Sequence, residues 1–593
     1  MSISSLPSIA LLLRGQSATA EDRNLTRLLE FFDIPCKTFD RHDAAVDEVE
    51  EQYAILSSVD CILDALNGAD SPGQSLPPWI MKARSVYIYG FHDDERSTKL
   101  LRSLTGGPQA RVRPISVATT TVTVAGGSPE ICGAMTGMRV PITLRSPGCV
   151  FDVGPESNAI QGIVRSDEGY VVLAVTYRGV RFYLNAWERT IDISAISAKY
   201  FDVKHFFCEA VPIVFYLKWA FRETARAMDE TSACLIVDDP PLKRRYGFLD
   251  FREALNLMQQ HNFTSTIAFI PWNWRRTYPR TLSIFQKHPE RFSLVVHGCD
   301  HTKSEFAVRS TADLNKKIQI SLQRIERFQR RASIDADRVM VFPQGQFSVE
   351  TGRALKLNGF VAAVNTEVAP AQESTNETTI ADLWNVAIMK YGTFPIFTRR
   401  YLHHGIENFA FDALLGKPCL IAAHHDVFKD HARDLVDFVR RLNSLKWNLV
   451  WRPLGEVVRR GFTSGRLDDG TRVVQMFACS LVLENQGSDA QKTLLMKEEL
   501  DPDSVESVQV NQAPVEFSVE GGYLRAWLTA VPGETTNVRI TYRNPLEAIS
   551  GRVSSKTKIK VAVNRYLSEF RDNYLSRSEF LYQSAYRLKH LMK

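Results

Sequence analysis

The sequence Ala233-Cys234-Leu235-Ile236-Val237-Asp238-Asp239 joins an apolar run directly to two carboxylates. A short apolar run of this kind is typical of a strand that is buried on both faces of a parallel sheet. The arrangement recurs further along the chain, where Phe292-Ser293-Leu294-Val295-Val296 precedes His297-Gly298-Cys299-Asp300-His301. Because the carboxyl ends of parallel strands share one edge of a sheet, these polar groups are expected to meet there.

The two pairs of side chains have the composition of a catalytic metal site. His297 and His301 are four residues apart, so one turn of helix would place both imidazoles on one face. Together with one carboxylate they form a set that leaves coordination positions open for water and substrate, and the second aspartate is then free to act as a base. The alternative is that the aspartates cap a helix and the histidines are ordinary polar residues. The joint occurrence of both pairs after strand patterns favours the metal site.

Four stretches resemble the motifs of the polysaccharide deacetylases, the carbohydrate esterases that share the chitooligosaccharide deacetylase homology domain. The stretch 237–241, Val-Asp-Asp-Pro-Pro, resembles their Thr-Phe-Asp-Asp-Gly-Pro motif, and 297–301 is similar to their His-Ser/Thr-x-x-His motif. The stretch 341–345, Val-Phe-Pro-Gln-Gly, resembles the third motif, Arg-x-Pro-Tyr/x-Gly. The stretch 420–426, Leu-Ile-Ala-Ala-His-His-Asp, resembles the final strand with its leucine and histidine. The motifs follow the family's order and cover about residues 230 to 460.

The resemblance implies a metal-dependent hydrolase that removes N-acetyl groups from an acetylated oligo- or polysaccharide. Zn²⁺ or another divalent ion would be held by Asp239, His297 and His301, and Asp238 would take the proton of the attacking water. A histidine after the last strand, His425 by motif position or else His424, would protonate the departing amine.

The resemblance also implies a substrate-binding region around the third motif, with Pro343, Gln344 and Gly345. The backbone N–H near Gln344 would help to hold the oxyanion. Trp272 and Trp274 follow a predicted strand closely, and they either stack on sugar faces or pack in the core.

Two departures from the family pattern bear on activity. Val341 and Phe342 stand in the region where the family has the arginine that orients its catalytic aspartate, and Arg338, Arg399 and Arg400 are the candidate replacements. Pro240 stands where the family has glycine, which stiffens the loop under the substrate. These departures leave two alternatives open: a catalytically silent glycan-binding or scaffold protein on the same barrel, and a hydrolase of non-sugar amide bonds.

Composition places the chain among globular proteins. It has 593 residues, 44% of them hydrophobic and 23% charged, and a net charge of +5. A net charge this small relative to chain length predicts no general nucleic-acid surface. The N-terminus has no positive segment before a short apolar run, and no uncharged stretch has transmembrane length, so we expect neither a signal peptide nor a transmembrane segment. Nine cysteines without CxxC spacing favour a reducing compartment, and the predicted location is cytoplasmic.

We expect a multidomain α/β protein with four segments. Residues 1–225 alternate strands and helices, 226–465 form a parallel (β/α) barrel of deacetylase type, 466–550 form a β-sandwich and 551–593 form a helical tail. The tail mixes apolar and basic residues; the predicted role is packing against its own chain, with a peripheral membrane or protein contact as the alternative.

The first segment ends in a predicted hairpin, 169–185, that turns at Arg178-Gly179. This hairpin resembles the one that closes domains similar to class I glutamine amidotransferases. Cys132 does not match the glycine-flanked elbow of their nucleophile, so we expect this segment to be non-catalytic.

Overall fold

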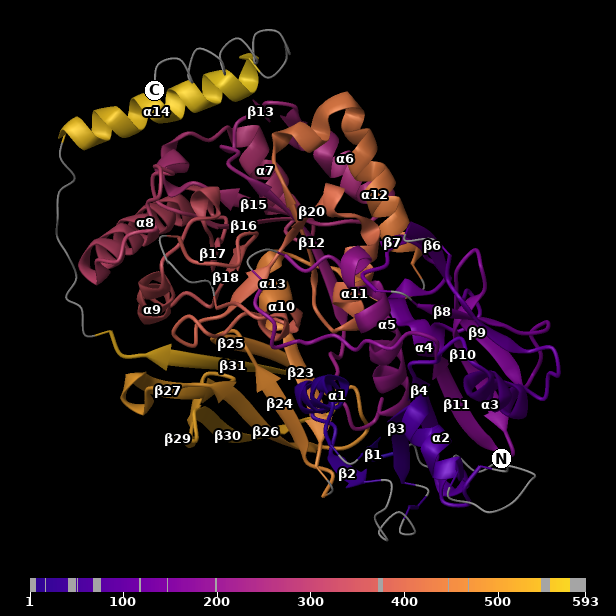
Figure 1. Cartoon of the computed structure of the whole chain (residues 1–593). Helices are drawn as coiled ribbons and strands as arrows, with labels where there is room; N and C mark the ends of the chain where they lie inside the picture. The colour runs from indigo at the N-terminus through magenta and orange to yellow at the C-terminus, as the bar shows by residue number, and fades with distance from the viewer. Residues whose placement is uncertain are drawn as a thin grey trace.

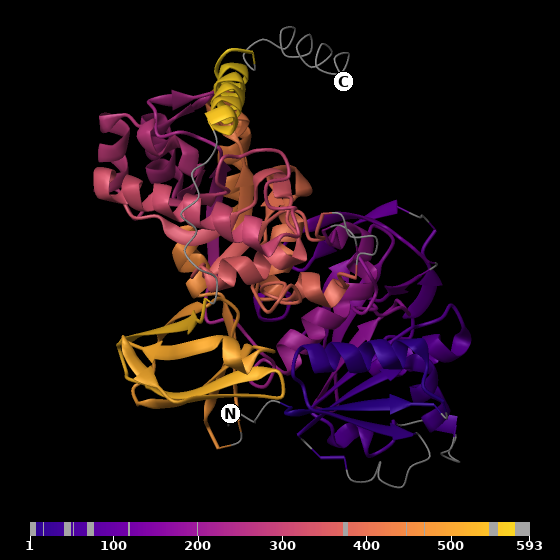
Figure 2. The ribbon, with the colours of Figure 1, turned by 90° about the vertical axis from the view of Figure 1, so that its left-hand side faces the viewer.

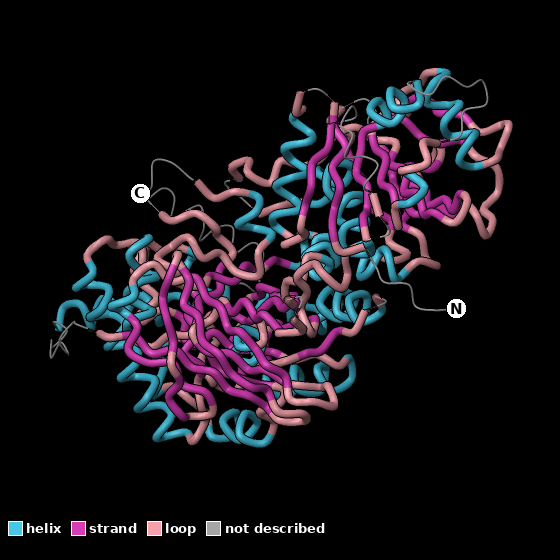
Figure 3. The backbone as a smooth tube through the Cα atoms, turned by 90° about the horizontal axis from the view of Figure 1, so that it is seen from below, coloured by secondary structure: helices cyan, strands magenta, loops and turns pink. Residues whose placement is uncertain are grey.

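The structure is a computed structural model of the chain (Figure 1). It describes these residues: 7–15, 17–40, 49–50, 52–67, 76–116, 119–146, 148–197, 200–371, 377–445, 447–467, 469–544 and 555–575. Figure 3 shows the strands of the N-terminal sheet and those of the C-terminal sandwich as two separate groups.

The N-terminal part contains an 11-stranded mixed sheet. Five strands run parallel in the order β2-β1-β3-β4-β11, with the bounds β1 Ile9–Arg14, β2 Cys36–Asp40, β3 Tyr53–Ser58, β4 Ser85–Tyr89 and β11 Val180–Asn185. The antiparallel remainder consists of β5 Arg111–Pro114, β6 Thr119–Val124, β7 Arg139–Thr143, β8 Cys149–Asp152, β9 Ile160–Arg165 and β10 Tyr170–Tyr177.

Helices cover both faces of this sheet. Consecutive side chains of a strand point to opposite faces, and here both sets are apolar, so each face has its own core. Ala10 and Leu12 of β1 belong to one core, and Leu11 and Leu13 belong to the other. The first core contains α1 Ala20–Phe31 and α5 Val203–Ala220, and the second contains α2 Val59–Asn67 and α3 Glu95–Thr105. The short α4 is Pro129–Cys132. The predicted hairpin is present, and Arg178 and Gly179 both have positive φ, as its tight turn requires.

The middle part is a parallel barrel. In chain order its strands are β12 Thr231–Asp238, β15 Ser265–Phe269, β16 Phe292–His297, β17 Asp337–Val341, β18 Ala362–Asn365, β19 Ile396–Thr398, β20 Arg400–Tyr401 and β21 Cys419–Ala423, while β22 Leu449–Trp451 pairs with the start of β12. At one end of the sheet β19 pairs with β18, and at the other end β20 pairs with β21. Only Arg399 separates β19 from β20, so this segment of chain closes the sheet on itself. The predicted parallel barrel is confirmed.

Helices surround the barrel (Figures 1 and 2). Their bounds are α6 Phe251–His261, α7 Pro279–Lys287, α8 Thr311–Ala332, α9 Val349–Leu357, α10 Ile380–Trp384, α11 Ile406–Leu414, α12 Arg433–Ser444 and α13 Leu454–Arg459. Short turns follow four strands at the mouth: η4 Pro271–Arg275, η5 Pro343–Gly345, η6 Leu402–His404 and η7 His425–Ala432. A small hairpin, β13 Arg245–Tyr246 and β14 Leu249–Asp250, follows β12.

The C-terminal part contains the predicted β-sandwich. One sheet has the order β23-β24-β26-β30-β29 and the other β25-β31-β27-β28. The strands are β23 Phe462–Arg466, β24 Arg472–Met476, β25 Ser480–Glu484, β26 Gln491–Glu498, β27 Val505–Val510, β28 Ala513–Val515, β29 Phe517–Glu520, β30 Tyr523–Ala530 and β31 Thr535–Tyr542. Side chains in β31 alternate between exposed and buried, as expected of a strand with one face on a core.

A last helix, α14 Ser555–Asn573, crosses the barrel at its mouth (Figures 1 and 2). The predicted helical tail is thus partly observed, and its residues 576–593 lie outside the described part of the chain. Among the described residues, no helix is long and apolar enough to cross a membrane.

Candidate metal and catalytic site

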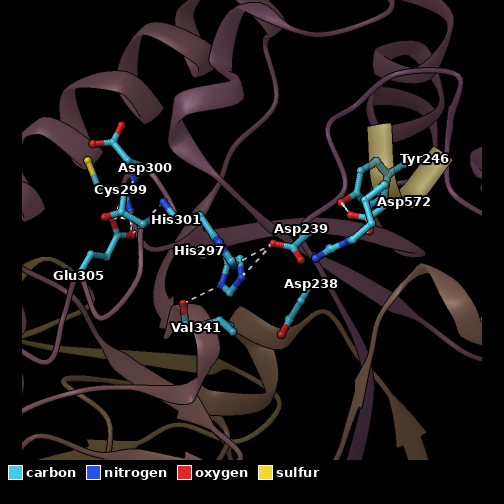
Figure 4. A network of polar contacts seen from close by, with 12 residues as sticks. Asp238, Asp239, Tyr246, His297, Cys299, Asp300, His301, Glu305, Val341 and Asp572 are labelled. Carbon is cyan, nitrogen blue, oxygen red and sulfur yellow. Dashed lines mark hydrogen bonds and ion pairs between the residues drawn. The ribbon is translucent and has the colours of Figure 1, made fainter. Parts of the chain in front are cut away.

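Three predicted metal ligands meet at the barrel mouth (Figure 4). One carboxylate oxygen of Asp239 lies 3.0 Å from Nε2 of His301 and 3.5 Å from Nε2 of His297. The three ligand atoms lie within 4.8 Å of one another. Asp239 adopts φ +82°, a strained conformation for a non-glycine residue of the kind that clusters at functional sites.

The donor set fits a cation. Nδ1 of His297 lies 2.9 Å from the carbonyl oxygen of Val341, which only a protonated Nδ1 can satisfy, so Nε2 turns its lone pair toward Asp239. The Asp239 oxygen there is buried, and no described residue donates a hydrogen bond to it in good geometry. Burial raises the pKa of Asp239, but His301 and His297 outweigh burial when their imidazoles carry protons, and they hold this pKa well below its usual range. A cation in place of those protons would keep the carboxylate charged in the same way. A charged carboxylate facing a nitrogen lone pair is the environment that a divalent metal ion stabilises.

The loop between the histidines differs from the expected turn of helix. Residues 298–301 are not helical, and Gly298 and His301 both have positive φ. The buried carboxylate of Glu305 accepts hydrogen bonds from the backbone N–H groups of residues 299–302. A Cβ at position 298 would lie 2.2 Å from that carboxylate and 2.4 Å from Pro343, so this position requires glycine. The prediction of a helical turn was therefore wrong: the carboxylate of Glu305 binds four consecutive amides and holds these residues in a non-helical loop.

Asp238 is held by Arg399, the residue between β19 and β20 where the barrel closes. Arg399 donates two hydrogen bonds to it, Nη1 to Oδ1 at 2.7 Å and Nη2 to Oδ2 at 2.6 Å, and both residues are only 4% exposed. Burial raises the pKa of Asp238, but Arg399 outweighs it and lowers the pKa below its ordinary value. Of the three candidate replacements, Arg399 makes this contact, whereas Arg338 bonds to Asn358 O and Arg400 to Asp412.

The two adjacent histidines point to different places. Ala423 of β21 pairs with Val237 of β12, so the next residues, His424 and Asp238, extend side by side from neighbouring parallel strands. The charge of His424 contributes, after burial, Arg399 and His297, to the pKa of Asp238. His424 is exposed at the mouth.

His425 points away from Asp238, toward residue 247 and α14. A Cβ at Gly247 would lie 2.3 Å from its Nδ1, and its Nε2 is 3.7 Å from Asp572 Oδ1 on α14. The ring of His425 also packs edge-on against Tyr246 and beside Phe248. The structure therefore brings His424, rather than His425, beside the proposed base.

The third motif forms the turn η5 directly after β17. Pro343 is buried against the His297–His301 loop, whereas Gln344 is exposed and has φ +59°. Gly345 has φ +67°, and a Cβ there would lie 2.7 Å from Glu367, so the turn depends on glycine. These residues border the mouth of the barrel, and their contact with substrate stays a prediction.

The two tryptophans lie in η4, also at the mouth. Trp274 packs against the core, with the guanidinium of Arg275 4.4 Å from its ring centroid. Trp272 meets the ring of Tyr566 on α14 edge-on at 6.1 Å. Trp274 thus has a packing role, whereas Trp272 lies where α14 covers the mouth; stacking of either ring on a sugar stays a prediction.

The N-terminal sheet offers no second nucleophile at Cys132. This thiol is buried, and burial, with a smaller contribution from Glu130, raises its pKa to about 12. A thiol in this state is not poised for nucleophilic attack at neutral pH. The similarity of this sheet to amidotransferase-like domains stays a prediction.

No protein-family model matches the sequence, and a search of curated proteins finds no match. Solved structures do match. The chain is similar to Agd3, described as a novel carbohydrate deacetylase, with 9% identity and a TM-score of 0.49 over 90% of this chain and 98% of that one. It is similar to a family 4 carbohydrate esterase from Streptomyces lividans, with 13% identity and a TM-score of 0.23 over 38% of this chain and 93% of that one. It is also similar to BA3943, a CE4 family pseudoenzyme from Bacillus anthracis, with 10% identity and a TM-score of 0.25 over 39% and 67% of the two chains.

Two of these descriptions name carbohydrate esterase family 4, and the third names a carbohydrate deacetylase. Because every one of these TM-scores is below 0.5, the activity of the chain has to be argued from its own site. Two residues of that site were not singled out by sequence reasoning: Glu305, which shapes the histidine loop, and Asp572, which reaches the mouth from α14. The signal for Glu305 was available, since a glutamate four residues after His301 is within reach of the loop amides.

Proposed function

We propose that this chain is a metal-dependent hydrolase that removes N-acetyl groups from a carbohydrate. The observation that carries the proposal is the pairing of two sites on adjacent residues of β12. Asp239 faces two imidazoles with an unsatisfied carboxylate oxygen, and Asp238 beside it is kept charged by Arg399. The substrate class comes from the resemblance of the four motifs to the polysaccharide deacetylases.

The roles of the side chains follow from their positions. Asp239, His297 and His301 hold the ion, which when bound supplies Lewis-acid polarisation of the acetamide carbonyl and of the attacking water. Asp238 takes a proton from that water, and Arg399 keeps its two oxygens oriented. Arg399 thereby does the work of the arginine that the third motif lacks, which argues against the catalytically silent alternative.

His424 protonates the departing amine. An amide nitrogen leaves poorly as an anion, so a proton donor is needed as the C–N bond breaks. His424 extends beside Asp238 from the neighbouring strand, whereas His425 packs against residues 246–248 and α14. The turn at Gln344 borders the site and is the proposed location of the oxyanion contact.

The proposal is tested by measuring acetate and free amine released from a panel of N-acetylated oligosaccharides with Zn²⁺, Co²⁺ or Ni²⁺ supplied. Asp238→Asn is expected to lower kcat about 10²–10⁴-fold, since the amide cannot accept the proton. His424→Ala is expected to lower kcat with little change in KM, because protonation of the amine matters only in the transition state.

His425→Ala is the matched comparison, because it changes the same residue type at the next position. Loss of kcat in His425→Ala with normal turnover in His424→Ala would show that the acid is assigned to the wrong histidine. Absence of acetate release by the unmodified chain from every substrate and metal would instead favour the glycan-binding alternative.

A further inference from the structure

The helix α14 turns its acidic side chains toward the barrel. Glu569 pairs with Lys243 and Arg276, and Asp572 accepts a hydrogen bond from Tyr246 Oη at 2.5 Å. The Oδ1 of Asn573, the next residue, accepts a hydrogen bond from the backbone N–H of Gly247 at 2.7 Å. Polar contacts therefore fasten the end of α14 to the barrel mouth (Figure 4).

Most apolar side chains of α14 face the other way, into solvent. More than half exposed are Ile559, Val563, Tyr566, Leu567, Phe570 and Tyr574. Tyr566 stands at the edge of this set and also meets Trp272 of the barrel, and Val561 is buried. At 3.6 residues per turn these six positions fall within about 100° of the helix circumference. This outer stripe is continuous along the helix, and it reverses the usual arrangement in which a helix buries its apolar face against its own protein.

Positive charge accompanies the outer stripe. Lys560 and Arg571 are exposed and lie along one edge of it, and the exposed Lys556 lies in line with it at the start of the helix. Arg571 also pairs with Asp572. Residues 551–593 contain ten Lys or Arg and three Asp or Glu, a net +7, whereas the whole chain has 72 basic and 67 acidic residues. The rest of the chain is therefore slightly acidic, and the positive charge of this protein is concentrated in its last segment.

We propose that α14 docks the chain on an anionic lipid surface, with the outer stripe inserted and the barrel mouth turned toward that surface. An apolar stripe edged by Lys and Arg is typical of helices that lie in the membrane interface. The mouth and α14 lie on the same side of the molecule (Figures 1 and 2). This inference rests on the proposed function. If the mouth faces a lipid surface, the substrate is a glycan held at that surface.

The positive charge of the last segment favours an anionic lipid surface over a second copy of the chain as the partner of the outer stripe. A symmetric contact between two outer stripes would bring two segments of +7 together, whereas an anionic surface attracts them. The two acidic residues of α14, Glu569 and Asp572, already have partners on the barrel. The outer face of α14 therefore complements anionic lipid in both polarity and charge.

The test is flotation of the full chain with vesicles of phosphatidylcholine, with or without about one-third phosphatidylglycerol. We expect binding to the anionic vesicles that is at least about ten-fold stronger. Val563→Ser, Leu567→Ser and Phe570→Ser combined should weaken binding at least about ten-fold. Lys556→Gln and Lys560→Gln should each weaken it about five-fold and only with anionic lipid.

The matched control combines Leu500→Ser and Trp527→Ser, which remove exposed apolar side chains from the sandwich and should leave vesicle binding unchanged. Circular dichroism checks that each variant is folded. Equal binding of the triple variant and the unmodified chain would overturn the proposal. So would concentration-dependent dimers that the triple variant loses, or vesicle binding that appears only when the chain ends at residue 575.

Vesicle binding is measured without substrate, so its failure leaves the deacetylase proposal standing. Conversely, an inactive chain that binds anionic vesicles through the outer stripe would refute the proposed function alone. The two proposals can therefore fail separately.

Discussion

Replacing Arg399 with leucine removes a charge at the point where the barrel closes. In Arg399→Leu the carboxylate of Asp238 would stay buried and lose both hydrogen bonds from the guanidinium. An unpaired buried charge of this kind costs about 3–5 kcal/mol. Without Arg399, burial would be the dominant influence on Asp238 and would raise its pKa, so the base would be protonated over more of the pH range.

Hydrogen exchange of peptides from β12 measures this loss locally, which matters because the separate parts of a multidomain chain need not unfold together. A loss of about 3–5 kcal/mol corresponds to exchange that is about 100- to 4000-fold faster. Adding Asp238→Asn to Arg399→Leu should recover most of the stability, because no unpaired charge then remains. It should not recover acetate release.

Arg400→Leu is the matched control. Arg400 is also buried and pairs with a carboxylate, Asp412, through Nε and Nη2 at 2.5 and 2.9 Å. Its loss should destabilise the barrel by a similar amount and leave the turnover of each folded molecule intact. Exchange in β12 that rises less than about ten-fold in Arg399→Leu would refute the dependence of Asp238 on Arg399.

Two further predictions concern the metal site. Equilibrium dialysis should find one Zn²⁺ per unmodified chain and little in the double variant His297→Ala, His301→Ala; full occupancy of that variant would mean that the ion binds elsewhere. Glu305→Gln should weaken Zn²⁺ binding about ten-fold and destabilise the loop by about 1–3 kcal/mol, because its carboxylate accepts four backbone N–H groups. Glu326→Gln, at an exposed position of α8, is the control, and equal Zn²⁺ affinity in both variants would contradict a role for Glu305 in shaping the site.

The barrel and its ligands could be predicted from the sequence because their signals are local. The strands that carry the ligands, β12 and β16, are mainly short apolar runs, and the polar groups stand at or soon after the strand ends, as Asp238 and Asp239 do at the end of β12. The loop at 298–301 could not be read this way. Its spacing of four residues is also the spacing of a helix, and only the three-dimensional contact with Glu305 and Pro343 decides between the two conformations.

The partner of Asp238 was beyond sequence reasoning for a different reason. Arg338, Arg399 and Arg400 have the same chemistry, and adjacent residues of an extended segment point in opposite directions. Which one faces Asp238 depends on how the sheet closes, a contact between residues 161 positions apart. The orientation of α14 was equally hidden, because its pattern is compatible with burial against its own chain.

The same residue that closes the barrel orients the base. Arg399 stands between the strand that pairs with β18 and the strand that pairs with β21, and its side chain reaches across to β12. Opening the barrel at this seam would therefore separate Arg399 from Asp238 and leave two buried charges without partners. Since that penalty is several kcal/mol, the ion pair between Arg399 and Asp238 also stabilises the closed barrel. An intact ion pair and a closed barrel are thus expected to be gained or lost together, whereas Arg400, one residue further on, stabilises the seam without touching the base.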